Sequence, residues 1–323
     1  MHMTTKETLL RLLEEQKGGW LSGEELAQRL GVSRTSIWKA VHALRQDGYE
    51  IQGAQNKGYC LSARTDILSE QGIRKYLNEA YAHMPIEVLP VATSTNALLR
   101  ERLDAGAPEG CTIIANAQTQ GRGRLGRSFY SPPDTGLYLS LLLRPQGLPP
   151  EQAVRVTTMA AVAACRAIEA VSGRRTQIKW VNDIFLDGRK VSGILTEGAV
   201  HLESGSLESM ILGIGINVYP PKDGFPPELA HTAGAVLDES RSDGKNRLAA
   251  GFLNQFWNIW NGAEYAAEYR QKSMVIGREL RVITASGERS AVALDVDDDC
   301  RLRVRYSDGT EATLSSAEVR VVL

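Results

Sequence analysis

Hydrophobic and polar positions divide the chain into three segments with different periodicities. In residues 5–47, leucine, isoleucine and valine recur at spacings of three and four, which is the period of amphipathic helices. Turns fall at GGWL and at Gly31, and Ser22 and Ser33 stand where N-caps are expected. Ser22 and Glu25 also fit a capping box. The pattern predicts three short helices joined by glycine turns.

The period changes after the third helix. Residues 49–61 (YEIQGAQNKGYCL) contain two short strand-like runs around a turn rich in glycine and asparagine. A hairpin that follows a helix-turn-helix pair is typical of the winged form of that motif. The sequence therefore predicts a winged helix-turn-helix domain over residues 1–65.

The middle segment, residues 66–272, mixes both periods. Continuous apolar runs predict strands at 112–115, 137–143 and 211–218, and longer amphipathic stretches predict helices near 151–172 and 245–270. The proline-rich residues 219–227 predict a loop. This segment is expected to be a mixed α/β domain.

Apolar and polar residues alternate strictly near the C-terminus. Residues 273–323 contain five short alternating runs separated by turn residues such as Asp308 and Gly309. Five short strands at this spacing predict a small SH3-like β-barrel. The chain as a whole is thus expected to be an α+β multidomain protein.

Composition narrows the class further. The 323 residues are 43% hydrophobic and 23% charged, which excludes disordered, collagen-like and disulfide-scaffold chains. The 37 basic and 38 acidic residues leave a net charge of −1, which excludes a wholly basic nucleic-acid coat protein but not a local basic patch. No apolar run of about 18 residues and no signal-peptide pattern occurs, so we expect a soluble, cytoplasmic protein. The four widely spaced cysteines suggest reduced thiols that pack in the interior.

The first domain carries such a basic patch. Residues 33–64 hold five basic and two acidic side chains. The outward face of the predicted third helix and the hairpin together provide side chains that can reach base edges and phosphates, namely Arg34, Thr35, Ser36, Lys39, His42 and Lys57. We interpret Trp38 beside this face as a packing residue. The domain is predicted to bind DNA, and a helical protein-interaction domain is the alternative.

A second candidate site is the loop GRGRLGR at 121–127. Its glycines (Gly121, Gly123 and Gly126) allow backbone amides to approach a ligand, and its arginines (Arg122, Arg124 and Arg127) favour an anion. The glycine spacing fits a dinucleotide fingerprint, but the following FYSPPDTG cannot start the required helix. A Walker A loop is excluded similarly, because arginine replaces its lysine. The RGG-like motif occurs once and lies between predicted strands, which argues against a disordered RNA-binding segment.

Three further segments contribute candidate residues. In 208–218 one predicted strand face carries Gly213, Gly215 and Asn217, so that a flat ligand or a neighbouring backbone could lie on it; a tight barrel corner is the alternative. In QIKWVND, Lys179 interrupts an apolar strand, and Lys190 follows one turn later. Three polar residues, Ser94, Thr95 and Asn96, precede a predicted helix, where such residues commonly act as caps.

Together these motifs resemble the bifunctional biotin protein ligases of bacteria, which are also repressors of the biotin operon. The matching motifs are Ser94–Asn96, Gln118 with GRGRLGR, KWVND with GRKVSGILTE, and GIGIN, in the family's order over about 90–220. Relatives often have a tryptophan near Phe129 and a proline at Val181. Neither difference removes a charged or hydrogen-bonding group, so the chemistry is expected to be retained.

The resemblance implies that biotin and ATP form biotinyl-adenylate, with Mg²⁺ on the phosphates, and that biotin then passes to a lysine of a biotin carboxyl carrier protein. It implies catalytic roles for Lys179, Arg122 and Arg124. The implied biotin-binding residues are Ser94, Thr95, Asn96, Gln118, Gly121, Arg122, Gly123, Arg124, Lys179, Gly213 and Gly215. The implied nucleotide-binding residues are Arg124, Arg127, Phe129, Lys179, Asn182, Lys190 and Asn217, with Asp183 beside the metal.

The resemblance also implies regulation. Adenylate binding would order the GRGRLGR loop, favour a homodimer and place two winged domains on operator DNA. Two other functions stay open at this point. One is a ligand-sensing transcription regulator without catalysis, and the other is a lipoate-type protein ligase, which shares the fold and adenylate chemistry.

Overall fold

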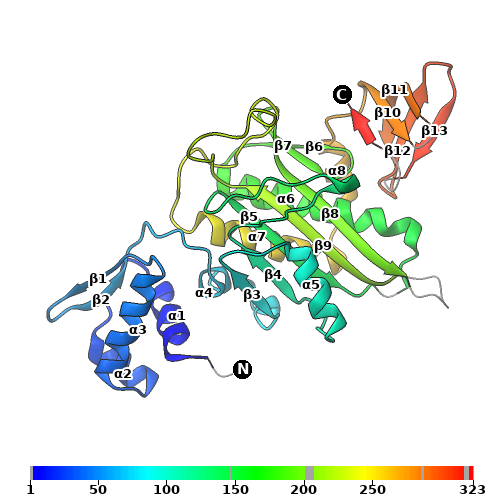
Figure 1. Cartoon of the computed structure of the whole chain (residues 1–323). Helices are drawn as coiled ribbons and strands as arrows, with labels where there is room; N and C mark the ends of the chain where they lie inside the picture. The colour runs from blue at the N-terminus through cyan, green and yellow to red at the C-terminus, as the bar shows by residue number, and fades with distance from the viewer. Residues whose placement is uncertain (1–2, 146, 201–206, 285–286, 316–319, 323) are drawn as a thin grey trace. The chain divides into compact units, whose positions relative to one another are not determined.

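The computed structural model describes residues 3–145, 147–200, 207–284, 287–315 and 320–322 (Figure 1). Its contacts divide the chain into two compact units. The first contains Met1–Ala82 and Ser240–Ala250, and the second contains His83–Glu239 and Gly251–Leu323. The two units are described separately below.

The first unit begins with the predicted winged helix-turn-helix. Its helices are α1 (Thr5–Glu15), α2 (Gly23–Leu30) and α3 (Arg34–Gln46), and its wing is the antiparallel pair β1 (Ile51–Ala54) and β2 (Gly58–Leu61). The Ser22 and Ser33 side chains accept hydrogen bonds from the backbone N–H groups of Glu25 and Ser36, as the capping pattern predicts. Leu9, Leu26 and Ile37 are fully buried between the helices. The predicted domain type is confirmed.

Two more segments complete this unit. They are α4 (Glu70–Arg74) with the short 3₁₀ helix η1 (Glu79–Tyr81), and the N-terminal part of α7 (Gly244–Trp260). Asn246 at the start of α7 is fully buried and accepts a hydrogen bond from the backbone N–H of Ser69, 3.1 Å away. Gly72 of α4 lies against the same amide, and a Cβ there would stand 2.5 Å from Asn246 Nδ2. These contacts tie α4 to the start of α7.

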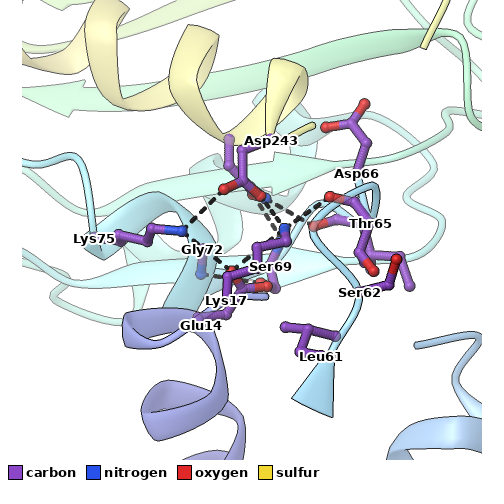
Figure 2. Close-up of polar contacts among 12 residues, drawn as sticks. Glu14, Lys17, Leu61, Ser62, Thr65, Asp66, Ser69, Gly72, Lys75 and Asp243 are labelled. Carbon is purple, nitrogen blue, oxygen red and sulfur yellow. Dashed lines mark hydrogen bonds and ion pairs between the residues drawn. The ribbon is translucent and has the colours of Figure 1, made fainter. Parts of the chain in front are cut away.

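A buried cluster of charges lies beside these contacts (Figure 2). The Asp243 carboxylate accepts hydrogen bonds from Lys17, from Lys75 Nζ at 3.0 Å and from the Tyr76 hydroxyl at 2.6 Å. Glu14 lies 3.5 Å from Lys17 Nζ, and its side chain is only 1% exposed. The cluster therefore joins α1, α4 and the residue that precedes α7.

The two carboxylates of the cluster have opposite pKa shifts. Burial alone would raise the pKa of Asp243, but the hydrogen bonds from Lys17, Tyr76 and Lys75 outweigh it and lower the pKa below its usual value. Burial raises the pKa of Glu14, and the nearby lysines only partly oppose the shift. Ionised Asp243 thus stabilises the unit, whereas ionised Glu14 costs stability.

The second unit is built on a seven-stranded sheet with the order β3-β4-β5-β9-β8-β7-β6. Only the β3–β4 pair is parallel, and each other neighbouring pair is antiparallel. The strands are β3 (Ile86–Leu89), β4 (Thr112–Ala115), β5 (Gly136–Leu143), β6 (Thr176–Lys179), β7 (Asp183–Leu186), β8 (Arg189–Val200) and β9 (Leu207–Asn217). The predicted strands at 112–115, 137–143 and 211–218 are all present, and 219–227 is a loop.

One predicted strand is divided in two. The segment QIKWVND was expected to be a single strand, but the chain turns at 180–182, so Lys179 ends β6 and Asp183 begins β7 directly opposite it. This hairpin brings a lysine and a carboxylate to neighbouring positions of one sheet face.

Helices cover the sheet. Helix α5 (Thr95–Asp104) packs on β4, β5 and β9, and α6 (Ala153–Ser172) packs on β6, β7 and β8. The predicted helix at 245–270 is interrupted: α7 ends at Trp260 and α8 (Ala266–Lys272) begins after a turn. Gly262, with φ of 108°, explains the break, because this backbone conformation cannot continue a helix.

The C-terminal segment forms five antiparallel strands, as the alternation predicts. They are β10 (Glu279–Thr284), β11 (Gly287–Val296), β12 (Leu302–Tyr306), β13 (Glu311–Leu314) and β14 (Arg320–Val322). Their order is β13-β12-β11-β10-β14, and within the described residues no pairing joins the two edge strands. The five strands predicted for the small SH3-like β-barrel are thus present as one antiparallel sheet.

Two findings bear on the class of the protein. Among the described residues, no helix is both long and apolar enough to cross a membrane. The four cysteines are free thiols, of which Cys60, Cys165 and Cys300 are buried and Cys111 is partly exposed.

Candidate active site

One transverse row of residues crosses five strands of the large sheet. Lys179 pairs with Asp183, Asp183 with Gly193, Gly193 with Gly215, and Gly215 with Tyr138. Residues directly opposite one another on neighbouring strands place their side chains on the same face. The row therefore presents a charged end on β6 and β7 and a centre without side chains on β8 and β9.

A pocket lies over this row, within the second unit. It brings together most of the residues singled out in the sequence. Those that line it are Ser94, Thr95, Asn96, Gln118, Arg122, Gly123, Arg124, Arg127, Phe129, Lys179, Asn182, Asp183, Lys190, Gly213 and Gly215. Segments more than one hundred residues apart in the chain thus share one hollow.

Parallel pairing explains how one wall of the pocket forms. The chain continues beyond β3 and β4 in parallel, with a bridge between Ala92 and Gln118. The N terminus of α5 consequently lies beside Gln118, whose Oε1 accepts a hydrogen bond from Thr95 N at 2.9 Å. Ser94 occupies the N-cap position, but within the described part of the chain its hydroxyl makes no capping bond to the helix. It lines the pocket instead of acting as the cap that its sequence position suggests.

Arg124 links the glycine and arginine loop to the charged end of the row. The loop is closed by a hydrogen bond from Gly123 N to Arg127 O at 2.7 Å and by a bridge between Arg122 and Ser128. Arg124 Nη1 donates to Asn182 Oδ1 at 3.3 Å. Burial lowers the pKa of the Arg124 guanidinium, which stays charged at neutral pH. The other two arginines are exposed.

Asp183 is surrounded by cations. Lys190 Nζ lies 2.6 Å from its carboxylate, Lys179 is its partner in the adjacent strand, and its charge acts on Arg124. Within the described residues, no group of three or more histidine, cysteine, aspartate or glutamate side chains could hold a metal ion. A metal at Asp183 would thus depend on phosphate oxygens for its other ligands, which is how proteins commonly bind Mg²⁺.

The two glycines of β9 make room for different neighbours. A Cβ at Gly213 would stand 2.2 Å from Asn96 Oδ1, and one at Gly215 would stand 2.5 Å from the Phe129 ring. Both glycines line the pocket, as the side-chain-free face predicts. Asn96 and Phe129 therefore each need a glycine at the neighbouring position, which the sequence pattern did not indicate.

This geometry gives a first prediction. We expect Gly213→Ala to displace Asn96 and raise the KM for the acid substrate of the pocket at least about tenfold, because a buried hydrogen-bond network would be disrupted. The matched control is Gly251→Ala on α7, which lies outside the pocket lining and where a Cβ would meet its nearest atom, of Ala167, at 3.4 Å. Steady-state kinetics of both variants measures the effect. Equal KM values for the two variants would contradict the role given to Gly213.

Two predicted site residues lie outside the pocket lining. Gly121, the first residue of the loop, is buried, and a Cβ there would stand 2.5 Å from Phe129 O. Asn217 Nδ2 donates to Gly234 O at 3.0 Å. Their proposed contacts with ligands stay predictions. The sequence reading also missed Ser140 and Glu197, which contact the pocket residue Asn96 from behind. A serine within the apolar run LYLSLLL was the available signal for Ser140.

The winged domain presents the predicted DNA-facing side chains. Arg34, Thr35, Lys39, His42 and Lys57 are exposed, and Ser36 is partly buried against the Ser33 hydroxyl at 2.9 Å. Interpreting Trp38 as a packing residue was wrong: it is 56% exposed, with its ring centroid 5.6 Å from that of His42. The buried positions of α3 are Ile37, Ala40, Val41 and Leu44, and Trp38 lies outside this stripe.

Comparisons with known proteins agree with this arrangement. Residues 88–217 match the biotin/lipoate A/B protein ligase family, residues 5–60 match a helix-turn-helix domain, and residues 275–321 match the biotin protein ligase C-terminal domain. The chain is 33% identical to the bifunctional ligase/repressor BirA of Bacillus spizizenii, over 98% of both chains. It is 31% identical to the biotin–[acetyl-CoA-carboxylase] ligase of Mycobacterium tuberculosis, over 67% of this chain and 82% of that protein.

Solved structures support the fold. The biotin protein ligase of Aquifex aeolicus in complex with biotin and ATP matches with a TM-score of 0.60 and 24% identity, over 74% of this chain and 98% of that chain.

Proposed function

Because this chain belongs to the family of BirA bifunctional ligase/repressors, we propose that it joins biotin to AMP and then transfers biotin to a lysine of a biotin carboxyl carrier protein. The observation that carries the proposal is the pocket in which Lys179, Arg124 and Lys190 surround one end of a row whose centre has no side chains. A flat, uncharged ring system fits the glycine centre, and anionic groups fit the cationic end.

The chemistry needs no protein nucleophile. A biotin carboxylate oxygen attacks the α-phosphorus of ATP, the bond to the β-phosphate oxygen breaks, and pyrophosphate leaves. The protein must hold two anions together and stabilise the charge that develops between them. Lys179 would bridge the carboxylate and the α-phosphate, and Arg122, Arg124 and Arg127 would close over the adenylate and pyrophosphate. The carrier lysine amine then attacks the acyl carbon and releases AMP.

Other pocket residues would divide between the two substrates. Ser94, Thr95, Asn96 and Gln118 would contact biotin over the floor that Gly213 and Gly215 provide. Asn182, Lys190 and Phe129 would face the nucleotide, and Asn217 would face it from outside the pocket lining. Asp183 would hold Mg²⁺ together with phosphate oxygens, and the ion would neutralise phosphate charge.

A single assay tests the reaction. Purified protein with ATP and biotin is expected to release pyrophosphate, and to label added carrier protein. Octanoate or lipoate in place of biotin tests a lipoate-type ligase. Release with these acids but not with biotin would overturn the proposed substrate. Biotin binding without any pyrophosphate release would instead favour a regulator that only senses the ligand.

The winged domain supports a second activity, repression of biotin genes in the cytoplasm. We propose that adenylate favours a homodimer whose two winged domains bind a palindromic operator. A ligand can cause this only by binding the dimer-competent state more tightly. Biotin and ATP together are therefore expected to tighten operator binding at least about tenfold in a gel-shift titration, within the usual range of coupling energies.

A matched variant locates the DNA-binding surface. Lys39→Ala is expected to weaken operator binding and reduce its salt dependence, because one phosphate contact is lost. Pyrophosphate release by the same variant should be unchanged. Operator affinity that depends neither on ligand nor on Lys39 would contradict the repressor proposal.

A further inference from the structure

Behind the α5 wall of the pocket lies a carboxylate that does not line it. Glu197 is on β8, its side chain is 32% exposed, and its Oε2 accepts a hydrogen bond from Asn96 Nδ2 at 2.7 Å. Its other oxygen lies 3.6 Å from Arg100 Nη2. Asn96, by contrast, is 94% buried and lines the pocket.

The carboxylate fixes the orientation of the Asn96 amide. An ionised carboxylate only accepts hydrogen bonds, so the NH₂ group must face Glu197 and Oδ1 must face the other way. On that side Ser140 Oγ lies 2.6 Å from Oδ1. Ser140 is fully buried, and its single proton is therefore donated to Asn96.

The position of the Ser140 proton determines the hydrogen bonds that Thr95 can make. Its Oγ1 lies 2.7 Å from Ser140 Oγ and 3.2 Å from Gln118 Oε1. Ser140 Oγ is the donor toward both Asn96 Oδ1 and Thr95 Oγ1, so the proton that it gives to Asn96 is not given to Thr95. The Thr95 hydroxyl donates to Gln118 Oε1, and because Asn96 holds the Ser140 proton, a lone pair of Thr95 is left as a hydrogen-bond acceptor at the pocket. Gly213 permits this arrangement, since a Cβ would displace Asn96 Oδ1.

We propose that Glu197 is a positioning residue that directs the chain Glu197–Asn96–Ser140–Thr95, so that Thr95 accepts a hydrogen bond from an N–H group of the acid substrate. The inference rests on the proposed function, in which the cyclic urea of biotin supplies that N–H group. A site with a fixed acceptor selects for a ligand donor at that point and rejects an analogue that lacks it.

The test measures biotin binding by calorimetry without ATP, using four forms of the full chain. Glu197→Leu removes the acceptor and is expected to raise the Kd for biotin at least about tenfold. Glu197→Gln can still accept from Asn96 and is expected to stay within about threefold. Arg100→Ala removes only the exposed ion pair and is expected to stay within about twofold. A merely structural role would instead lower the melting temperature of Glu197→Leu and raise its KM for ATP as well.

A second readout reports the direction of the chain. The probe is a biotin analogue with a ring oxygen in place of one urea N–H. The ratio of its Kd to that of biotin is expected to fall at least about tenfold in Glu197→Leu relative to wild type, because the Asn96 amide can then turn and the Ser140 proton can occupy the Thr95 lone pair that biotin would use. Unchanged biotin affinity and an unchanged ratio in Glu197→Leu would overturn this inference alone. Wild-type protein that fails to bind biotin would overturn the proposed function as well.

Discussion

Lys179→Ala is expected to slow adenylate formation by at least about a hundredfold while the fold is retained. Removing a charged group that stabilises the transition state costs about 3 kcal/mol or more. Lys179 ends β6, is partly exposed at the pocket and neighbours Asp183 across the strand pair. Its loss should therefore remove charge at the reacting centre without leaving a cavity in the hydrophobic core. Pyrophosphate release, together with thermal unfolding, measures both effects.

Lys190→Ala is the comparison variant for this experiment. Lys190 lies on β8 and pairs with Asp183 at 2.6 Å, so its removal also changes the charge of the pocket. If Lys179 bridges the two substrates, its replacement should reduce the rate constant, whereas Lys190→Ala should mainly raise the KM for ATP. A Lys179→Ala variant with wild-type rates would refute the assignment.

Asp243→Asn is expected to destabilise the first unit by about 3 kcal/mol or more. The substitution removes the negative charge that compensates Lys17 and Lys75, and breaking one side of a buried ion pair commonly costs this much. Asparagine tolerates the left-handed backbone of this position, where φ is 56°, so backbone strain should not contribute. Denaturant unfolding of the full chain gives the change in the free energy of unfolding.

Glu14→Gln is the matched control, because Glu14 belongs to the same cluster but has the opposite pKa shift. Its ionisation costs stability as pH rises above its usual pKa of 4.5, so its replacement should change stability at pH 7 by less than about 1 kcal/mol. The contribution of Asp243 is present above its usual pKa of 3.8 and disappears as pH falls through its lower folded-state value. Equal losses for the two variants at pH 7 would contradict this account.

Periodicity and turn residues were enough to predict most elements. The three helices of the winged domain, its hairpin and the five C-terminal strands follow from spacings of three to four and of two. The same rules failed at two breaks. The turn at 180–182 begins with Trp180 and Val181, which suit a strand, and Gly262 interrupts a sequence with helical spacing after Trp260.

The sequence likewise revealed some of the site residues and not others. Lys179, Arg124 and the glycines of β9 were recognisable because each interrupts a pattern: a lysine in an apolar run, a cluster of guanidinium groups, a strand face without side chains. Glu197 interrupts nothing, since a carboxylate on a strand usually faces solvent. Its role depends on which residue of α5 lies beside it, and this is fixed only by the packing of α5 on the sheet.

The transverse row across β6, β7, β8, β9 and β5 also sets a limit on how the gene can vary. Successive side chains of a strand alternate between the two faces, so one inserted or deleted residue within β8 would turn Gly193 away from Gly215. The proline-containing loop 219–227 carries no residue of the row and has no such restriction. Length differences among natural homologues should accordingly gather in that loop and be rare in the strands that carry the row.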